Sequence, residues 1–371
     1  MKVKLEEVCK RIYAGGDVPK DRYSEEKTEY YKVPIFANAE KDEGLYGYTD
    51  EAREKELSIT VAARGTIGYT VIRREPFLPV VRLITVVPDL EKVSERYLFY
   101  ALKMCKPQSS GTSIPQLTVP DIKRNTLNLL DIAEQESIAN RLDKLNGIIK
   151  LRTEVISKLD ELIRARFVEL FGEPETNPNG WGTVTINDVC SSIVRGPFGS
   201  ALKKDFFVKP DDTTYKVYEQ KHAIQKSATI GEYYITEEKY KELKRFECES
   251  GDILMSCSGT MGEFYQLPEG CERGIINQAL CKFTLNDKML PICFLIYMAQ
   301  TIGNIETKGS GIKNIAAVSY LKQMTINLPP MNIQEEFASF VEQVNKSKVE
   351  VQRALDEAQL LFDSLMQKYF G

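Results

Sequence analysis

Several strings in this chain come close to catalytic motifs without meeting their spacing. Asn327-Leu-Pro-Pro-Met is similar to the Asn/Asp-Pro-Pro-aromatic loop that holds an extruded base in amino-methyltransferases, but Leu328 stands where a proline belongs. In the acidic string at residues 88–92, Glu91 and Lys92 are adjacent, whereas in a nuclease cluster one residue stands between the glutamate and the lysine. The sequence contains no Walker A loop, which would cradle phosphates. We therefore predict that the chain has no catalytic residues.

Metal chemistry is equally poorly supported by the residue types. His222 is the single histidine, and the eight cysteines contain no CxxC pair, so paired zinc ligands are missing from the sequence. We predict no metal site and expect reduced, mostly buried thiols in a cytoplasmic protein. The start of the chain lacks the apolar stretch of a signal peptide. The longest apolar run, residues 289–299, is too short to span a bilayer, so no membrane partner is predicted.

The second half of the chain repeats the first. The string IAEQESIANRL returns as NIQEEFASFV, and aligning Gln135 with Gln334 gives an offset of 199 that persists to Gly172 and Gly371. Strings earlier in each half match at smaller offsets. VKLEEVC matches VTINDVC at an offset of 181 residues, and RGTIG matches SGTMG at an offset of 194 residues. Constant spacing at the end of each half, with drifting spacing in front, predicts a rigid element attached to a variable globular part.

A 4-3 spacing of apolar residues predicts that each rigid element is a long helix with a coiled-coil seam. Two matched seams in one chain are natural partners, although packing of each helix on its own domain is an alternative. Arg152 and Arg166 interrupt the first seam, and we interpret them as contacts that set the register or bind a partner. The predicted seam residues are Ile138, Leu142, Leu145, Ile149, Ile156, Leu159 and Ile163 in the first helix, and Phe337, Val341, Val344, Val351, Leu355, Phe362 and Leu365 in the second.

These patterns divide the chain into five segments. Runs of β-branched and apolar residues such as LSITVAARG and QALCKFTL predict strands in the globular parts, and GEPETNPNGWG is a turn-rich linker. The predicted segments are a globular domain at 1–130, a helix at 131–171, a linker at 172–183, a second globular domain at 184–329 and a second helix at 330–371.

The order of these segments resembles the plan of type I restriction-modification specificity subunits over essentially the whole chain. LPPMNIQEEF is similar to the family's motif at the start of the second helix, and LLDIAEQESI is its counterpart. GPFGSAL is similar to a loop common at the front of such domains, while SSGTSIPQL and KGSGIKNI resemble the segment that leads into the conserved region. The resemblance implies an α+β fold: two mixed α/β target-recognition domains separated by a two-helix antiparallel coiled coil, forming a tandem pseudo-repeat.

The resemblance also implies a function and a set of partners. It implies binding to double-stranded DNA with a bipartite target, together with two methyltransferase subunits and, for cleavage, restriction/translocase subunits. The chain itself would hold no cofactor, because S-adenosylmethionine, ATP and Mg²⁺ would belong to the partner subunits. A helix of about 37 residues would extend about 55 Å, the length of roughly 16 base pairs, which is enough to leave an unread spacer between two half-sites.

Two segments concentrate positive charge within a chain of net charge −4. Residues 195–226 hold seven basic against four acidic residues, and residues 103–124 hold four against one. Base readout needs polar side chains on loops, while Lys and Arg serve the phosphates, although any one of these residues can be an ordinary solvated loop residue. The candidate DNA-binding residues are Arg64, Thr66, Ser110, Thr112, Ser113 and Gln116 in the first domain, and Ser200, Lys203, Lys204, Gln220, Lys221, Ser258, Thr260, Lys313 and Asn314 in the second.

A second interpretation of the same pattern is a coiled-coil adaptor that joins two proteins and never binds DNA. The sequence does not exclude it, and the net charge of −4 is an objection to DNA binding because it gives the chain no strongly basic field. Partner subunits that encircle the duplex would remove this objection by neutralising much of the phosphate charge. Isolated binding would then be weak and steeply dependent on salt.

Overall fold

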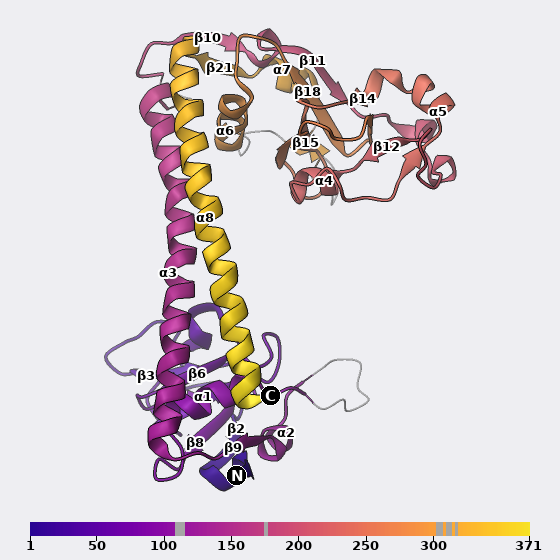
Figure 1. Cartoon of the computed structure of the whole chain (residues 1–371). Coiled ribbons are helices and arrows are strands. Elements are labelled where there is room, and N and C mark those ends of the chain that lie inside the picture. Colours follow the sequence, from indigo (N-terminus) through magenta and orange to yellow (C-terminus); the bar gives the residue numbers. More distant parts are fainter. Residues whose placement is uncertain (108–115, 174–176, 302–306, 309–313, 316–317) are drawn as a thin grey trace. The chain divides into compact units, whose positions relative to one another are not determined.

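The computed structural model describes residues 1–107, 116–173, 177–301, 307–308, 314–315 and 318–371 (Figure 1). The chain forms two compact units, Met1–Val155 with Val351–Gly371 and Ile156–Glu350. The boundary between the units falls within both long helices, α3 (Ile132–Phe171) and α8 (Met331–Phe370). Each unit therefore contains a globular part and one portion of each long helix.

The globular part of the first unit is built on three small sheets. A four-stranded antiparallel sheet has the order β2-β8-β5-β6, a three-stranded sheet has the order β4-β3-β7, and β1 pairs with β9. Helices α1 (Glu95–Lys103) and α2 (Val119–Arg124) follow the last strand of the large sheet. The strands are β1 (Lys2–Lys4), β2 (Cys9–Ala14), β3 (Val33–Phe36), β4 (Leu45–Thr49), β5 (Ser58–Val61), β6 (Thr70–Arg73), β7 (Leu78–Pro79), β8 (Ile84–Pro88) and β9 (Thr126–Asn128).

The second unit repeats this plan with insertions. Its sheets have the orders β11-β18-β15-β16 and β13-β12-β17-β14, with the pairs β10-β21 and β19-β20. Its helices are α4 (Gln220–Ile224), α5 (Glu237–Glu242), α6 (Pro291–Thr301) and α7 (Val318–Gln323). The strands are β10 (Gly182–Thr185), β11 (Cys190–Arg195), β12 (Tyr215–Tyr218), β13 (Tyr234–Ile235), β14 (Glu247–Cys248), β15 (Ile253–Ser256), β16 (Phe264–Gln266), β17 (Gly274–Ile276), β18 (Leu280–Leu285), β19 (Thr307–Lys308), β20 (Asn314–Ile315) and β21 (Thr325–Leu328).

The two units share a common topology. The sheet β2-β8-β5-β6 corresponds to β11-β18-β15-β16, and the pair β1-β9 corresponds to β10-β21. Lys2 pairs with Asn128, and Thr183 pairs with Asn327, which are equivalent positions under the offsets of the repeat. The predicted α+β fold with a tandem pseudo-repeat is thus confirmed. The apolar run at residues 78–88 forms two strands instead of one. The chain turns at Val81 and Arg82, both at positive φ, and this turn separates β7 from β8.

The long helices pack antiparallel within each unit. In the first unit, Arg141 Nη1 lies 3.4 Å from the hydroxyl oxygen of Tyr369, and Arg152 Nη1 donates to the carbonyl oxygen of Ala354. Residue numbers therefore rise along α3 as they fall along α8. Every predicted seam residue is buried or half-buried, which is the pattern of a coiled-coil interface.

Polar contacts continue this pairing in the second unit. Lys348 Nζ donates to Asp160 Oδ1 at 2.6 Å, and Arg166 forms an ion pair with Glu336. Both pairs are partly exposed, so each contributes only modestly to stability. Their value lies in register, because sliding one helix along the other separates a charged group from its partner.

The ends of the helices complete the globular cores. In the second unit the last turns of α3 bury Phe167 and Phe171, whose rings lie 4.2 Å apart between centroids, and Phe337 of α8 packs against both. The 4-3 pattern instead continues through Arg166 and Leu170. The buried face moves by one residue because a straight helix drifts relative to a heptad repeat and because these turns must also fill a core.

A buried glutamine joins α3 to the globular part of the first unit. The Gln135 side chain is fully buried, and its Oε1 accepts the backbone N–H of Ser94, the residue before α1, at 2.8 Å. Its Nε2 donates to the carbonyl oxygens of Lys92 at 3.1 Å and Leu130 at 2.9 Å. The amide thus satisfies three backbone groups at the point where α1 and α3 begin.

Gln334 makes the same three bonds in the second unit. Its Oε1 accepts the N–H of Leu290, just before α6, at 2.9 Å, and its Nε2 donates to the carbonyl oxygens of Lys288 and Pro329, both at 3.0 Å. The repeated Gln in the sequence is therefore a repeated structural element, which we call the glutamine clamp (Gln135 and Gln334).

We predict that Gln334→Ala lowers the free energy of unfolding by roughly 2–4 kcal/mol, because three backbone groups lose their buried partner at once. Urea denaturation followed by circular dichroism measures the change. Gln343→Ala is the matched control, since Gln343 is exposed on the same helix, and its effect should stay within about 0.5 kcal/mol. Equal midpoints for the two variants would contradict the role of the clamp.

Candidate nucleic-acid interface

The turn between β5 and β6 brings two candidate residues of the first unit together. Residues 64–66 of this turn are exposed, and Gly65 has φ +69°, a backbone conformation that glycine adopts without strain. The Arg64 guanidinium donates through Nε and Nη2 to Gln116 Oε1 at 3.1 and 2.9 Å. Thr66 lies two residues further along the same turn. The structure therefore joins side chains that are 52 residues apart in the sequence.

A cavity of about 130 Å³ beside this pair contains a further arginine that the sequence analysis missed. Arg82 lines it together with Arg64 and Gln116, and no acidic side chain is among the lining residues. Asn38 fixes the position, because its Oδ1 accepts the N–H of Ala63 at 2.7 Å and its Nδ2 donates to the carbonyl of the residue before Arg82 at 2.5 Å. Arg82 is the only charged residue in the apolar run of residues 78–88, and this isolated charge is the sequence feature that could have identified it. Two guanidinium groups around a hollow favour an anionic group such as phosphate.

The equivalent turn of the second unit lies between β15 and β16. Its residues Ser258 and Thr260 flank Gly259, which has φ +61°. A Cβ atom on Gly259 would lie 3.4 Å from Nε2 of Gln220, so the start of α4 lies against this turn. Lys221, the next residue of α4, pairs with Glu219 at 2.7 Å. The structure thus groups four of the candidates of the second unit on two neighbouring elements.

His222 anchors α4 and thereby positions Gln220 and Lys221. Its ring is fully buried, Nδ1 lies 2.8 Å from the N–H of Glu219, and Nε2 lies 2.7 Å from the carbonyl oxygen of Ile230. A neutral ring fits both contacts, since Nδ1 can accept and Nε2–H can donate. Burial lowers the pKa of His222 below its ordinary value. The histidine is therefore a structural residue of this interface, and nothing in its contacts suggests catalysis.

Three further candidates of the second unit, two of them basic, lie on the segment that follows β11. Ser200, Lys203 and Lys204 are exposed on two consecutive 3-10 turns. Leu202 and Phe207 fix this segment by packing on the core under the sheet β13-β12-β17-β14. The lysines therefore stand on an ordered, solvent-facing segment.

Four candidates, Ser110, Thr112, Ser113 and Lys313, lie outside the described residues. Asn314 belongs to strand β20. Among the residues that the structure describes, no three His, Cys, Asp or Glu side chains gather where they could hold a metal ion. In the same residues, no helix is sufficiently long and apolar to cross a membrane.

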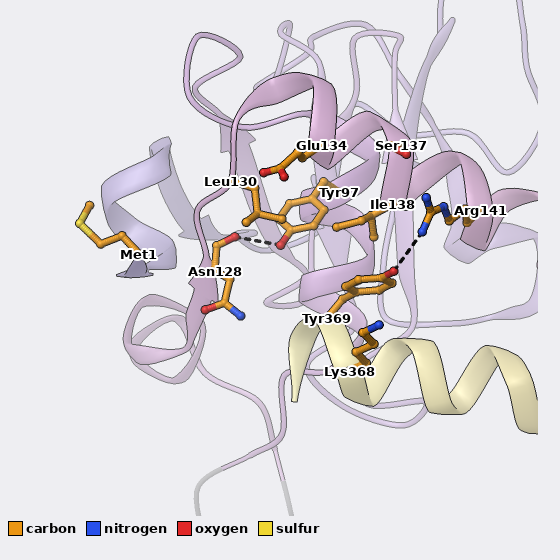
Figure 2. Close-up of a pocket in the computed structure, with 10 residues that line it drawn as sticks. All are labelled: Met1, Tyr97, Asn128, Leu130, Glu134, Ser137, Ile138, Arg141, Lys368 and Tyr369. Carbon is orange, nitrogen blue, oxygen red and sulfur yellow. Dashed lines mark hydrogen bonds between the residues drawn. The ribbon is translucent and has the colours of Figure 1, made fainter.

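A larger cavity of about 420 Å³ lies in the first unit, between the start of α3 and the end of α8 (Figure 2). Arg141 and Tyr369 meet on one side of it, and the Tyr97 hydroxyl donates to the carbonyl oxygen of Asn128 at 2.8 Å on the other. Its lining mixes apolar, acidic and basic side chains and contains none of the candidate DNA-binding residues. The cavity is therefore a feature of the helix pair, separate from the exposed turns.

We predict that the stability of the second unit decreases as the pH falls below about 6.5, the ordinary pKa of histidine. Because the folded state holds His222 with a lowered pKa, the unfolded state binds the proton more readily and protonation favours unfolding. The contribution is fully present above the unfolded pKa. Urea midpoints of wild type and His222→Gln at pH 7.5 and 5.5 test this. An identical pH dependence of the two proteins would contradict it.

The sequence matches the family described as the type I restriction modification DNA specificity domain over residues 1–161 and again over residues 178–358. Two putative type I specificity subunits of Mycoplasma pneumoniae are 41% and 39% identical over 142 residues, which is 38% of this chain. The matched region covers 42% and 39% of those relatives, so the chain spans about two fifths of their length.

Two solved structures resemble the fold over the whole chain. The crystal structure of the type I restriction-modification system S subunit from M. genitalium has a TM-score of 0.54, with 15% identity and 96% of that chain covered. A structure from work on complex assembly and conformational transition of the type I restriction-modification system has a TM-score of 0.63, with 16% identity and 97% covered. At these identities the likeness concerns the fold alone. Since the family match takes in most of both repeats, this chain belongs to the family of type I restriction modification DNA specificity domains and carries that domain twice.

Proposed function

We propose that this protein is the specificity subunit of a type I restriction-modification complex, in which each repeat reads one half of a bipartite double-stranded DNA target. Membership of the family supports the proposal. The observation that carries it is the pair of equivalent turns at residues 64–66 and 258–260, which are exposed except for the half-buried Ser258 and stand on one shared backbone frame.

The side chains at these turns suit base recognition. Arginine and glutamine can each make two hydrogen bonds to one base edge, and the first unit holds Arg64 and Gln116 side by side while the second places Gln220 beside Gly259. The two turns share a backbone but differ in sequence, so they would read different bases. Arg82, Lys203 and Lys204 are candidates for phosphate contacts, which position the protein without reading sequence.

The partner subunits would supply the cofactor binding and the catalysis. Two methyltransferase subunits would bind S-adenosylmethionine, and restriction/translocase subunits would bind ATP and Mg²⁺. This chain would be non-catalytic and would bind no cofactor. Its net charge of −4 fits a subunit that reads bases while its partners neutralise part of the phosphate charge.

A coiled-coil adaptor that never touches DNA is the competing function. It accounts for the long helices but gives no role to the pair Arg64 and Gln116 at the first turn or to Gln220 beside the second. Methylome mapping separates the two functions, because an adaptor would leave the methylated sequence unchanged when its globular domains are exchanged.

We predict that the purified chain alone neither methylates nor cleaves DNA. The reason is that the sequence lacks a base-holding Asn/Asp-Pro-Pro-aromatic loop and a Walker A loop. Methyl transfer from labelled S-adenosylmethionine and plasmid cleavage with ATP and Mg²⁺ are the assays, and the chain co-expressed with its methyltransferase is the positive control. Turnover by the chain alone would overturn this part of the proposal.

We predict that replacing residues 1–130 with the matching domain of a relative changes one half-site and leaves the other intact. The donor must keep aromatic residues at Tyr97 and Tyr100, because these rings pack against Phe370 and Phe362 at centroid distances of 4.8 and 6.1 Å. Methylated adenines are then mapped across the genome for wild type and hybrid. The reciprocal exchange of residues 184–329 is the matched control. A hybrid in which both half-sites change would show that the repeats do not read independently.

A further inference from the structure

Phe198 is an exposed aromatic residue at the edge of the candidate interface of the second unit. Its side chain is 65% exposed, whereas the neighbouring Gly196 and Pro197 are buried. A phenylalanine held in water forgoes the hydrophobic stabilisation that burial would give. An isolated exposed apolar residue is unremarkable by itself. The residues around Phe198 distinguish it from such an isolated residue.

The backbone that carries Phe198 is held firmly in place. The N–H of Gly196 donates to the carbonyl of Leu280 at 3.0 Å, and a Cβ atom at Gly196 would lie 1.9 Å from the carbonyl oxygen of Asn277. No side chain fits there, so the chain is pressed against the start of β18. On the other side, Gly199 has φ +67° and turns the chain into the 3-10 segment anchored by Leu202. The ring is therefore presented by a rigid turn.

One cationic group contacts the ring, and two more follow it along the chain. The guanidinium carbon of Arg195 lies 5.1 Å from the ring centroid of Phe198, which is a cation–π contact. The exposed Lys203 and Lys204 follow on the anchored segment. Residues 195–209 contain four basic residues and one acidic residue. An exposed ring in contact with one arginine, on a segment rich in basic residues, fits a ligand that combines flat apolar faces with phosphates.

At the equivalent place the first unit keeps the hydrogen bond of the glycine but has no aromatic ring. Gly15 is related to Gly196 by the offset of 181, and its N–H donates to the carbonyl of Leu83 at 2.8 Å as that of Gly196 does to Leu280. Asp17 stands at the position of Phe198. The backbone frame is thus shared by the two units, whereas the aromatic residue belongs to the second alone.

We infer that Phe198 stacks on, or wedges between, nucleobases of the half-site read by the second unit. Arg195 supports the ring, and Lys203 and Lys204 contact the flanking phosphates. Wedges of this kind are made by phenylalanine in proteins that unstack and bend DNA. This inference rests on the proposed function, because it presupposes that the second unit binds DNA. It adds a specificity contact that depends on how readily a base step unstacks.

The test uses the full chain co-purified with its methyltransferase subunits and a duplex carrying the target that methylome mapping of wild type provides. Fluorescence anisotropy measures affinity. A 2-aminopurine base in the second half-site, away from the methylated adenine, reports unstacking. Phe198→Ala should bind roughly 10- to 100-fold more weakly and lose the 2-aminopurine signal, since stacking on one base contributes about 1–3 kcal/mol. Phe198→Tyr should retain both, because its ring presents the same flat face to a base.

Matched controls separate the possible failures. Asp17→Ala alters the equivalent turn of the first unit and should leave the 2-aminopurine signal of the second half-site unchanged. Lys203→Ala should weaken binding and reduce its salt dependence without abolishing the signal. If wild type binds no duplex, the proposed function fails. If wild type binds and Phe198→Ala binds equally well, the contact of Phe198 with the bases is wrong and the proposed function stands.

Discussion

The glutamine clamp is the constraint on which each unit depends. Where a long helix begins, its first backbone N–H groups and the carbonyls of the segment before it have no partners within the helix. Gln135 and Gln334 resolve part of this problem with one side-chain amide each, whose oxygen and nitrogen together bind three backbone groups. Because an amide has donors on one side and an acceptor on the other, only one orientation of the side chain satisfies all three. The clamp therefore fixes where α1 or α6 begins relative to the long helix.

The hydrophobic core makes the same connection on a larger scale. The core of the first unit includes Ile138 and Leu142 from α3 and Met366 from α8, and the core of the second includes Phe167 and Phe337. Each globular part is thus closed by the beginning of one helix and the end of the other. The helix pair cannot separate without opening both cores. Arg152 and Lys348, which bind across the pair, add register to an interface that apolar residues alone would leave free to slide.

Because the helices and sheets hold the fold, the side chains on the two turns can differ between the units. The strands beneath residues 64–66 and 258–260 occur in the same sheet order in both units, while the side chains above them differ. Preorganisation is visible in the contact of Arg64 with Gln116, in the support that His222 gives to α4, and in the contact of Arg195 with Phe198. A recognition protein benefits from this division, because side chains held in place lose less conformational entropy on binding.

The sequence by itself determined the repeat, the long helices and their seam, because periodicity and spacing are local properties that survive without knowledge of the fold. It also identified the residues of the two turns, through the matching strings RGTIG and SGTMG. Tertiary structure alone decided that Phe167 and Phe171 are fully buried in the core, while Leu170 packs only at its edge. It also decided that Arg64 meets Gln116, that Gln220 lies beside Gly259, and that Arg82 joins the first site. These contacts form on sheets in which β8 lies between β2 and β5 in the first unit and β18 lies between β11 and β15 in the second, so the neighbours in space are not neighbours in sequence. No period or motif encodes such a juxtaposition, since it arises only when the strands have paired and the turns between them have taken their final conformation.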